Sequence, residues 1–122
     1  MNGIKFLLDT NILIGLLNGH RDAMSLLEEN HACPDVCAYS SITRMELLGW
    51  AGMTTQQSML ASSLLASMHR IPVGPAEEDA VISLRRVRKI KLPDAIIVAT
   101  AKANGLQLLT LDRQILSLTS EH

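Results

Sequence analysis

The chain has 122 residues, of which 48% are apolar, and 11 lysine and arginine residues stand against 12 aspartate and glutamate residues. A chain of this length and composition can bury a core of its own, which excludes collagen, extended disorder and small disulfide scaffolds. The net charge of −1 gives no general attraction to nucleic acid or to a membrane surface. Asp9 interrupts the first apolar stretch before it is long enough to be the core of a signal peptide. No run approaches the roughly 20 apolar residues of a membrane span. We therefore expect one cytoplasmic domain over residues 1–122.

Short apolar runs alternate along the chain with segments of helical periodicity. The apolar runs predict four buried strands, at residues 5–8, 36–39, 70–73 and 106–109. Helices are predicted around residues 12–17, 23–27, 41–49, 54–68, 80–87 and 93–103, with a short last helix after Asp112 and a frayed tail over 117–122. Because each right-handed crossover packs back on the sheet, this order predicts the α/β class, a doubly wound parallel sheet with helices on both faces.

Two of the predicted helices have informative ends. The segment 95–103 is almost wholly apolar, which predicts a helix buried on most sides, and Asn104-Gly105 is a typical left-handed helix terminator. The helix over 80–87 runs into a basic cluster. Its members are Arg85, Arg86, Arg88, Lys89 and Lys91.

Four acidic residues are predicted to meet at one edge of this sheet. Asp9 directly follows the first strand, and Asp112 follows the fourth. Glu46 and Asp94 lie in the first turns of helices that run antiparallel to the strands, so both fall at the carboxyl edge as well. Ligands of doubly wound sheets bind at this edge.

Each acid taken singly has a structural explanation. Asp9 and Asp112 occupy turn or helix-cap positions, Thr43 and Glu46 match a capping box, and the dipole of a helix favours Asp94 in its first turn. Taken together, four clustered carboxylates would repel one another unless a cation neutralised them. Mg²⁺ or Mn²⁺ suits such an all-oxygen site. An ion held there can polarise a phosphate and acidify a bound water, which is the chemistry of metal-assisted phosphodiester hydrolysis.

Four segments resemble, in order, the motif blocks of PIN-domain ribonucleases, and in particular the VapC-type toxins of toxin–antitoxin pairs. The segments are LLDTNILI at residues 7–14, SITRMELLG at 41–49, LPDAIIVATA at 92–101 and GLQLLTLD at 105–112. The resemblance implies a PIN-like sheet of four to five strands. Many relatives end with a fifth strand after the last acid, whereas residues 113–122 of this chain have few apolar side chains.

The resemblance also implies an activity and its residues. It implies an endoribonuclease that depends on Mg²⁺ or Mn²⁺, with Asp9 and Asp94 as direct metal ligands. Glu46 and Asp112 would complete the metal site through waters or a second ion. Thr110 matches the hydroxyl residue of the last block and would orient a carboxylate or a water. Family members commonly form homodimers, and a cognate VapB-like antitoxin silences them by filling the acidic groove with its tail.

The sequence indicates contacts with RNA less clearly than it indicates the acidic site. Arg85, Arg86 and Arg88 can bind phosphates near Asp94, although a helix C-terminus favours cations in any case. Asn11 is a further candidate for substrate binding, with a turn role as its alternative. We expect the single tryptophan, Trp50, to pack in the core, with a contact to a partner chain as the alternative.

Other functions fit the sequence less well. Cys33, Cys37 and His31 lack the further ligands that complete a zinc site, and Cys37 is expected in the core. A receiver domain would need an aspartate after the third strand, where Gly74-Pro75 stand, and a haloacid-dehalogenase-like phosphatase would need a second carboxylate at Asn11. The main alternative is a catalytically silent PIN-like module that binds RNA or protein, and the binding of a divalent ion discriminates between the two.

Overall fold

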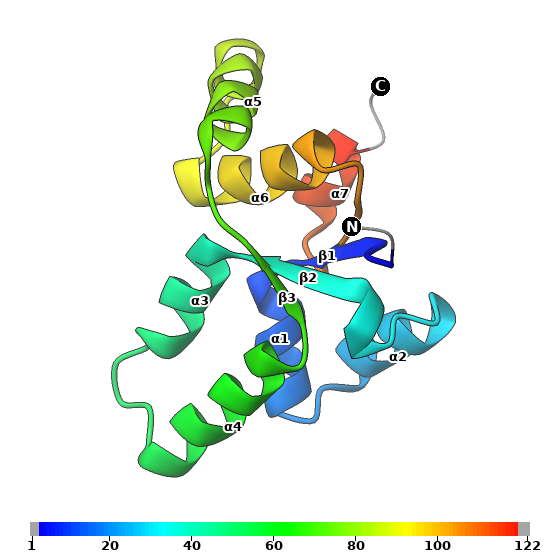
Figure 1. Cartoon of the computed structure of the whole chain (residues 1–122), viewed down its shortest axis with the longest axis vertical. Coiled ribbons are helices and arrows are strands. Elements are labelled where there is room, and N and C mark those ends of the chain that lie inside the picture. Colours follow the sequence, from blue (N-terminus) through cyan, green and yellow to red (C-terminus); the bar gives the residue numbers. More distant parts are fainter. Residues whose placement is uncertain (1–2, 120–122) are drawn as a thin grey trace.

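The computed structural model describes residues 3–119 of the chain. Its strands and helices alternate in the order that the sequence predicts (Figure 1). They are β1 (Phe6–Leu8), α1 (Thr10–Leu17), α2 (Arg21–Glu29), a 3₁₀ turn η1 (Pro34–Val36), β2 (Cys37–Ser40), α3 (Ser41–Leu48), α4 (Thr55–Ala66), β3 (His69–Ile71), α5 (Pro75–Val87), α6 (Leu92–Ala103), β4 (Gln107–Leu109) and α7 (Arg113–Thr119).

The strands form a parallel sheet in the order β3-β2-β1-β4. Phe6 in the central strand β1 pairs with Cys37 of β2 on one side and with Gln107 of β4 on the other. The edge strand β3 ends at Ile71, two residues before the predicted end, because Pro72 has no backbone N–H to donate to a neighbouring strand.

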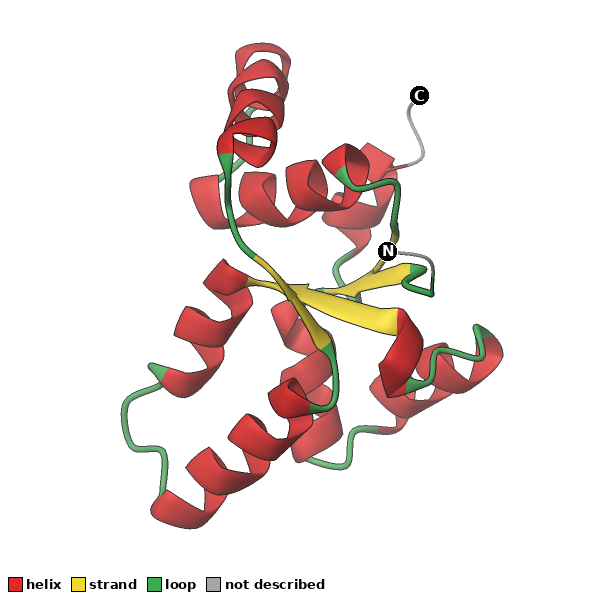
Figure 2. Ribbon diagram, in the orientation of Figure 1, coloured by secondary structure: helices red, strands yellow, loops and turns green. Residues whose placement is uncertain are grey.

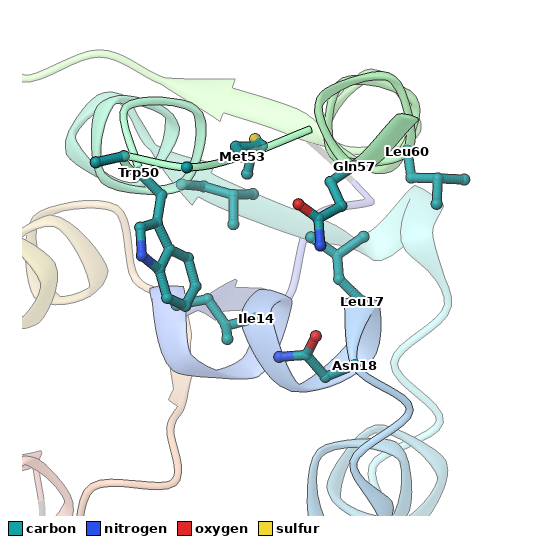
Figure 3. Close-up of a pocket in the computed structure, with 10 residues that line it drawn as sticks. Ile14, Leu17, Asn18, Trp50, Met53, Gln57 and Leu60 are labelled. Carbon is teal, nitrogen blue, oxygen red and sulfur yellow. The ribbon is translucent and has the colours of Figure 1, made fainter. Parts of the chain in front are cut away.

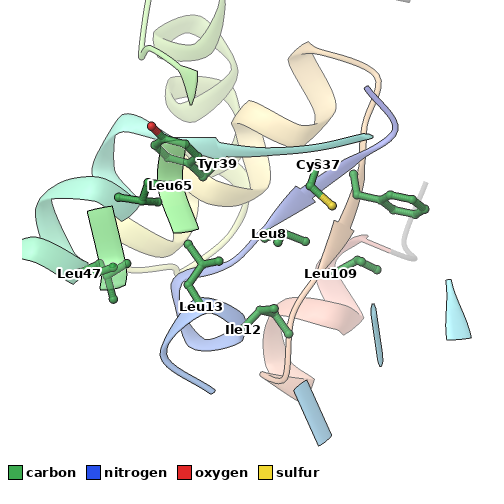
Figure 4. Packing of buried hydrophobic residues seen from close by; sticks show 10 residues of the cluster. Leu8, Ile12, Leu13, Cys37, Tyr39, Leu47, Leu65 and Leu109 are labelled. Atoms are coloured by element: carbon green, nitrogen blue, oxygen red, sulfur yellow. The ribbon is translucent and has the colours of Figure 1, made fainter. Parts of the chain in front are cut away.

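Helices cover both faces of the sheet, which confirms the predicted doubly wound arrangement (Figure 2). Alternate residues of β1 serve the two faces, as the pleat of a strand requires. Leu8 packs with Leu13, Leu47 and Leu65 in the cluster under α1, α3 and α4 (Figure 4). Leu7 lies in the opposite cluster, which α6 and α7 cover.

Helix α6 is buried between the sheet and α5, as its apolar sequence predicts. Ile97, Val98 and Ala101 face the sheet, whereas Ala95 and Ala99 pack against Val81 of α5. Gly105 ends the helix with a φ of +65°, the left-handed conformation that glycine adopts without strain. The predicted terminator is therefore confirmed.

Two predictions about helix boundaries are wrong. Helix α5 begins at Pro75 and not near residue 80, because proline suits the first turn and Glu77 returns its side chain to the N–H of Gly74. Residues 117–119 belong to α7 and do not fray, and the rest of the predicted frayed tail, 120–122, lies outside the described residues.

The chain after the last predicted acid is helical as far as the structure describes it. Within residues 3–119 the sheet has four strands, the lower of the two numbers expected. Among the same residues, no helix combines the length and the apolar character needed to cross a membrane.

Candidate active site

A pocket of about 340 Å³ opens at the carboxyl edge of the sheet. All four predicted acids line it, although they are far apart in the sequence. They are Asp9, Glu46, Asp94 and Asp112. The predicted meeting of these residues is thus observed, and it follows from the parallel order of the strands.

Asp9 stands at the floor of the pocket, where β1 passes into α1. Its backbone N–H donates to the carbonyl of Leu109 in β4 over 3.0 Å, so the residue continues the ladder of the sheet. Its side chain caps α1 by accepting from the N–H of Thr10 at 2.7 Å, and it is only 7% exposed. Burial raises the pKa of Asp9, and the charges of Asp94 and Glu46 act in the same direction.

The loop after β4 holds the second oxygen of Asp9. The hydroxyl of Thr110 donates to Asp9 Oδ2 over 2.7 Å, and the amide of Asn11 donates to the same oxygen over 3.2 Å. The bond from Thr110 favours the ionised carboxylate and opposes the effect of burial on the pKa of Asp9. Asn11 also accepts from the N–H of Leu111, so it ties the loop to α1.

Asp112 lies at the outer end of the same loop. Its N–H donates to Thr110 Oγ1, and its carboxylate accepts from the N–H groups of Gln114 and Ile115. Asp112 therefore caps α7, as predicted, and it lines the pocket at the same time. The structural and the functional interpretations of this residue do not exclude each other.

Glu46 reaches the pocket from α3, but the capping box predicted with Thr43 is wrong. The helix starts at Ser41 and is capped by Ser40, which places Thr43 inside it. The hydroxyl of Thr43 is buried and lies 3.0 Å from that of Thr10. Thr10 Oγ1 is in turn 2.7 Å from Glu46 Oε1.

Asp94 is the least restrained of the four acids. It lies in the first turn of α6 and is half-buried, and its carboxylate takes no hydrogen bond from any residue within 3–119. Its charge nevertheless reaches Asp9, whose pKa it raises. A carboxylate that faces a pocket without a hydrogen-bond donor is open to an external ligand.

The donor set of the pocket fits a hard divalent cation. It consists of carboxylate and neutral oxygen groups, and none of the residues that line it is basic. Between residues 3 and 119, however, no three acidic, histidine or cysteine side chains converge closely enough to form a ready-made metal cage. The site therefore suits an ion that keeps several of its waters and takes only one or two direct carboxylate ligands, as Mg²⁺ does.

The predicted basic residues lie outside this pocket. Arg85 and Arg86 are exposed in the last turn of α5, and Arg88 follows as its cap. Lys89 and Lys91 complete the link to α6, which carries Asp94 in its first turn. The basic cluster is thus adjacent in the chain to the pocket but does not line it.

Beside the acidic pocket runs an apolar groove of about 300 Å³ between α1, α3 and α4 (Figure 3). Trp50 and Ile14 line both cavities, so the two are adjacent. The predicted burial of Trp50 is wrong, because its indole is 55% exposed. Trp50 lies just after the end of α3, in the link that leads to α4. Leu60 on α4, also 55% exposed, adds to the groove on the side away from the acids.

The two cysteines take no part in the site. Cys33 is exposed, and Cys37 is buried in the core as predicted. Burial raises the pKa of the Cys37 thiol to about 11, so it is neither a nucleophile nor a ready metal ligand near neutral pH.

Thr10 and Thr43 are the site residues that the sequence analysis missed. Both had a visible signal: Thr10 stands between Asp9 and Asn11, and Thr43 precedes Glu46 by three residues, which places the two on one face of a helix. The T-x-x-E pattern of Thr43 and Glu46 also matches a capping box, but Ser40 caps α3 and Thr43 lies inside the helix.

Comparison with known proteins defines the class of this fold and site. The PIN domain family model matches residues 6–120, and the chain therefore belongs to the PIN-domain family. No curated protein is significantly similar to the chain.

Several solved structures share the fold. The chain is 35% identical to a chain of a toxin–antitoxin complex from Klebsiella pneumoniae, with a TM-score of 0.80 over 93% of this chain and 91% of that one. It is 20% identical to a chain of DNA-bound VapBC from Salmonella typhimurium, with a TM-score of 0.76, over 93% of this chain and 91% of that chain. The chain is 22% identical to a chain of FitAcB from Neisseria gonorrhoeae, with a TM-score of 0.76 over 93% of this chain and 92% of that one.

Proposed function

We propose that this protein is a cytoplasmic endoribonuclease that depends on Mg²⁺ or Mn²⁺ and acts as the toxin of a toxin–antitoxin pair. One observation carries the proposal: four carboxylates from separate segments line one pocket, and none of the residues within 3–119 that line it is basic. Asp9 and Asp112 also cap helices, but four like charges at one pocket repel one another unless a cation neutralises them. Membership of the PIN-domain family and the 35% identity to a chain of a toxin–antitoxin complex support it.

In this proposal Asp9 and Asp94 hold the metal directly, and Glu46 and Asp112 complete the site through waters. A divalent ion, when bound, supplies positive charge to a phosphate and lowers the pKa of a water. Thr110 and Asn11 fix the direction of the Asp9 carboxylate by donating to it. Either Glu46 or Asp112 would accept a proton from an attacking water, because the hydrogen bonds described above engage only one carboxylate oxygen of each residue.

The substrate of the proposed enzyme is RNA. Arg85, Arg86 and Arg88 would bind its phosphates along the approach to Asp94, outside the pocket itself. Asn11, which lines the pocket, would contact the RNA next to the metal.

The proposed partners are a second copy of the chain and a VapB-like antitoxin. The apolar groove beside the acids suits an apolar segment of an antitoxin, because Trp50 and Leu60 are large and exposed there. Because the groove adjoins the acidic pocket, the tail of that segment would reach the four carboxylates.

The test is cleavage of total cellular RNA by the purified, antitoxin-free protein, with Mg²⁺, with Mn²⁺ and with EDTA. We expect discrete products that require the metal, and a loss of at least roughly 100-fold in Asp94→Asn, the upper range for even an outer-shell metal partner. Asp22→Asn, the same change at an exposed position of α2, is the matched control. Added antitoxin should stop cleavage by the wild-type protein and act less well on Leu60→Ala.

Two results would count against the proposal. Cleavage that survives in both EDTA and Asp94→Asn would point to a contaminating nuclease. Folded protein that cleaves no RNA with either ion would favour the alternative, a PIN-like module that only binds RNA or protein.

A further inference from the structure

Thr10 contacts two of the four carboxylates through different atoms. Its backbone N–H donates to Asp9 Oδ1 over 2.7 Å, and its hydroxyl lies 2.7 Å from Glu46 Oε1. The residue is the first of α1 and is 8% exposed. It therefore joins the end of β1 to α3 at the rim of the acidic pocket.

The direction of these hydrogen bonds follows from the number of protons. A carboxylate anion only accepts, and a hydroxyl donates one proton while it can accept others. Thr10 must then donate its single hydroxyl proton to Glu46. The 3.0 Å contact between the two threonine hydroxyls requires Thr43 to donate to Thr10.

Thr43 is committed to this contact. Its side chain is 0% exposed, inside α3, where a threonine hydroxyl would otherwise bond a carbonyl of the preceding turn. It points across to α1 instead. Hydrogen bonds in such a row polarise one another, so the donor behind Thr10 strengthens the bond to Glu46.

The hydrogen-bonded row of Thr43, Thr10 and Glu46 limits the rotamers of the Glu46 side chain, which has little other restraint. Glu46 is exposed on α3, and a free glutamate can adopt many rotamers. We infer that Thr10, supported by Thr43, is a positioning residue that holds the Glu46 carboxylate beside Asp9, with Oε1 engaged and Oε2 left for a metal-bound water or a proton. This inference rests on the proposed nuclease function.

Substitutions of matched shape test it. Thr10→Val keeps the backbone N–H to Asp9 and removes only the hydroxyl, and Thr10→Ser restores a hydroxyl. We expect Thr10→Val to lower the cleavage rate by about 10- to 100-fold, the usual effect of losing an outer-shell partner, with a smaller loss in Thr43→Val. Thr10→Ser should cleave close to the wild-type rate. Thr100→Val is the control, because Thr100 is equally buried but its hydroxyl has no partner in the described chain.

A second readout does not require activity. In the metal-free protein, Thr10→Val should lower the midpoint of thermal unfolding, and it should lower it much less in the Glu46→Ala background, where its acceptor is gone. Equal losses in both backgrounds would overturn the inference, and so would a Thr10→Ser enzyme as slow as Thr10→Val.

The two readouts also separate this inference from the function on which it rests. If the wild-type protein cleaves no RNA, the proposed nuclease fails, and the unfolding cycle alone then decides whether Thr10 holds Glu46. A wild-type rate of cleavage in Thr10→Val would overturn the inference while leaving the nuclease intact.

Discussion

Asp9 illustrates, at the scale of one residue, how a carboxylate can be both buried and prepared for a ligand. Burial is the largest influence on its pKa and raises it, whereas the bonds from Thr110 and from the N–H of Thr10 lower it. The charges of Asp94 and Glu46 add to the effect of burial. The pKa of Asp9 is raised overall, so ionisation of Asp9 destabilises the folded protein when no cation is bound.

This raised pKa predicts a pH dependence with a definite sign. Because the folded state binds the proton of Asp9 more tightly than the unfolded chain, the stabilising contribution is full below the ordinary pKa of 3.8 and is lost as the pH rises through the raised value. Metal-free wild-type protein should therefore lose free energy of unfolding relative to Asp9→Asn between acidic and neutral pH. Urea unfolding of both proteins across this range measures the difference. A difference that grows in the other direction would contradict the assigned cause.

The sequence predicted individual acids better than their partners. Asp9, Glu46, Asp94 and Asp112 are predictable because each follows a strand or lies in the first turns of a helix, and parallel strands bring such positions to one edge. The exposure of Trp50 was not predictable, because it depends on where the turn between α3 and α4 leaves the indole. A side-chain contact between α1 and α3 likewise depends on how the two helices pack, which local pattern does not encode.

At the scale of secondary-structure elements, the pocket depends on how α6 is held. Glu77 near the start of α5 accepts from the N–H of Gly74 at 2.9 Å and from the amide of Asn104 at 3.0 Å. Asn104 is the C-cap of α6, so the Glu77 carboxylate joins the beginning of α5 to the end of α6. The bond from Asn104 is the largest influence on the pKa of Glu77 and lowers it.

Replacing this carboxylate should weaken the α5–α6 pair. Glu77→Gln cannot accept from the Asn104 amide with its own NH₂ group, and we expect the free energy of unfolding to fall by about 1.5–3 kcal/mol near neutral pH, the scale for a hydrogen bond to a charged group. Since the pKa of Glu77 is lowered from 4.5, its contribution is present above that value and is lost as the pH falls through the lowered one. Chemical unfolding at both ends of this range checks it. Glu78→Gln, an exposed neighbour with the same change of charge, should have little effect.

At the scale of the whole molecule, the site is where four distant parts of the chain meet. Asp9 follows β1, Glu46 belongs to α3, Asp94 begins α6 and Asp112 follows β4. No basic residue in the described part of the chain lines the pocket between them, so the folded protein has mutual repulsion that the unfolded chain does not have. A cation that binds only the folded arrangement would remove this repulsion and link the four segments.

Divalent ions should therefore stabilise the entire fold, and not only enable cleavage. At about 100 times its dissociation constant, an ion that binds the folded state alone adds about 2.7 kcal/mol to the free energy of unfolding. We expect the thermal midpoint of the wild-type protein to rise with Mn²⁺ and not with K⁺ at equal ionic strength, because K⁺ lacks the charge to neutralise the cluster. Asp94→Asn should respond more weakly, whereas Asp22→Asn should respond like the wild type. If Mn²⁺ does not change the midpoint of thermal unfolding of the wild-type protein, the four acids bind no ion, and their convergence then needs a different explanation.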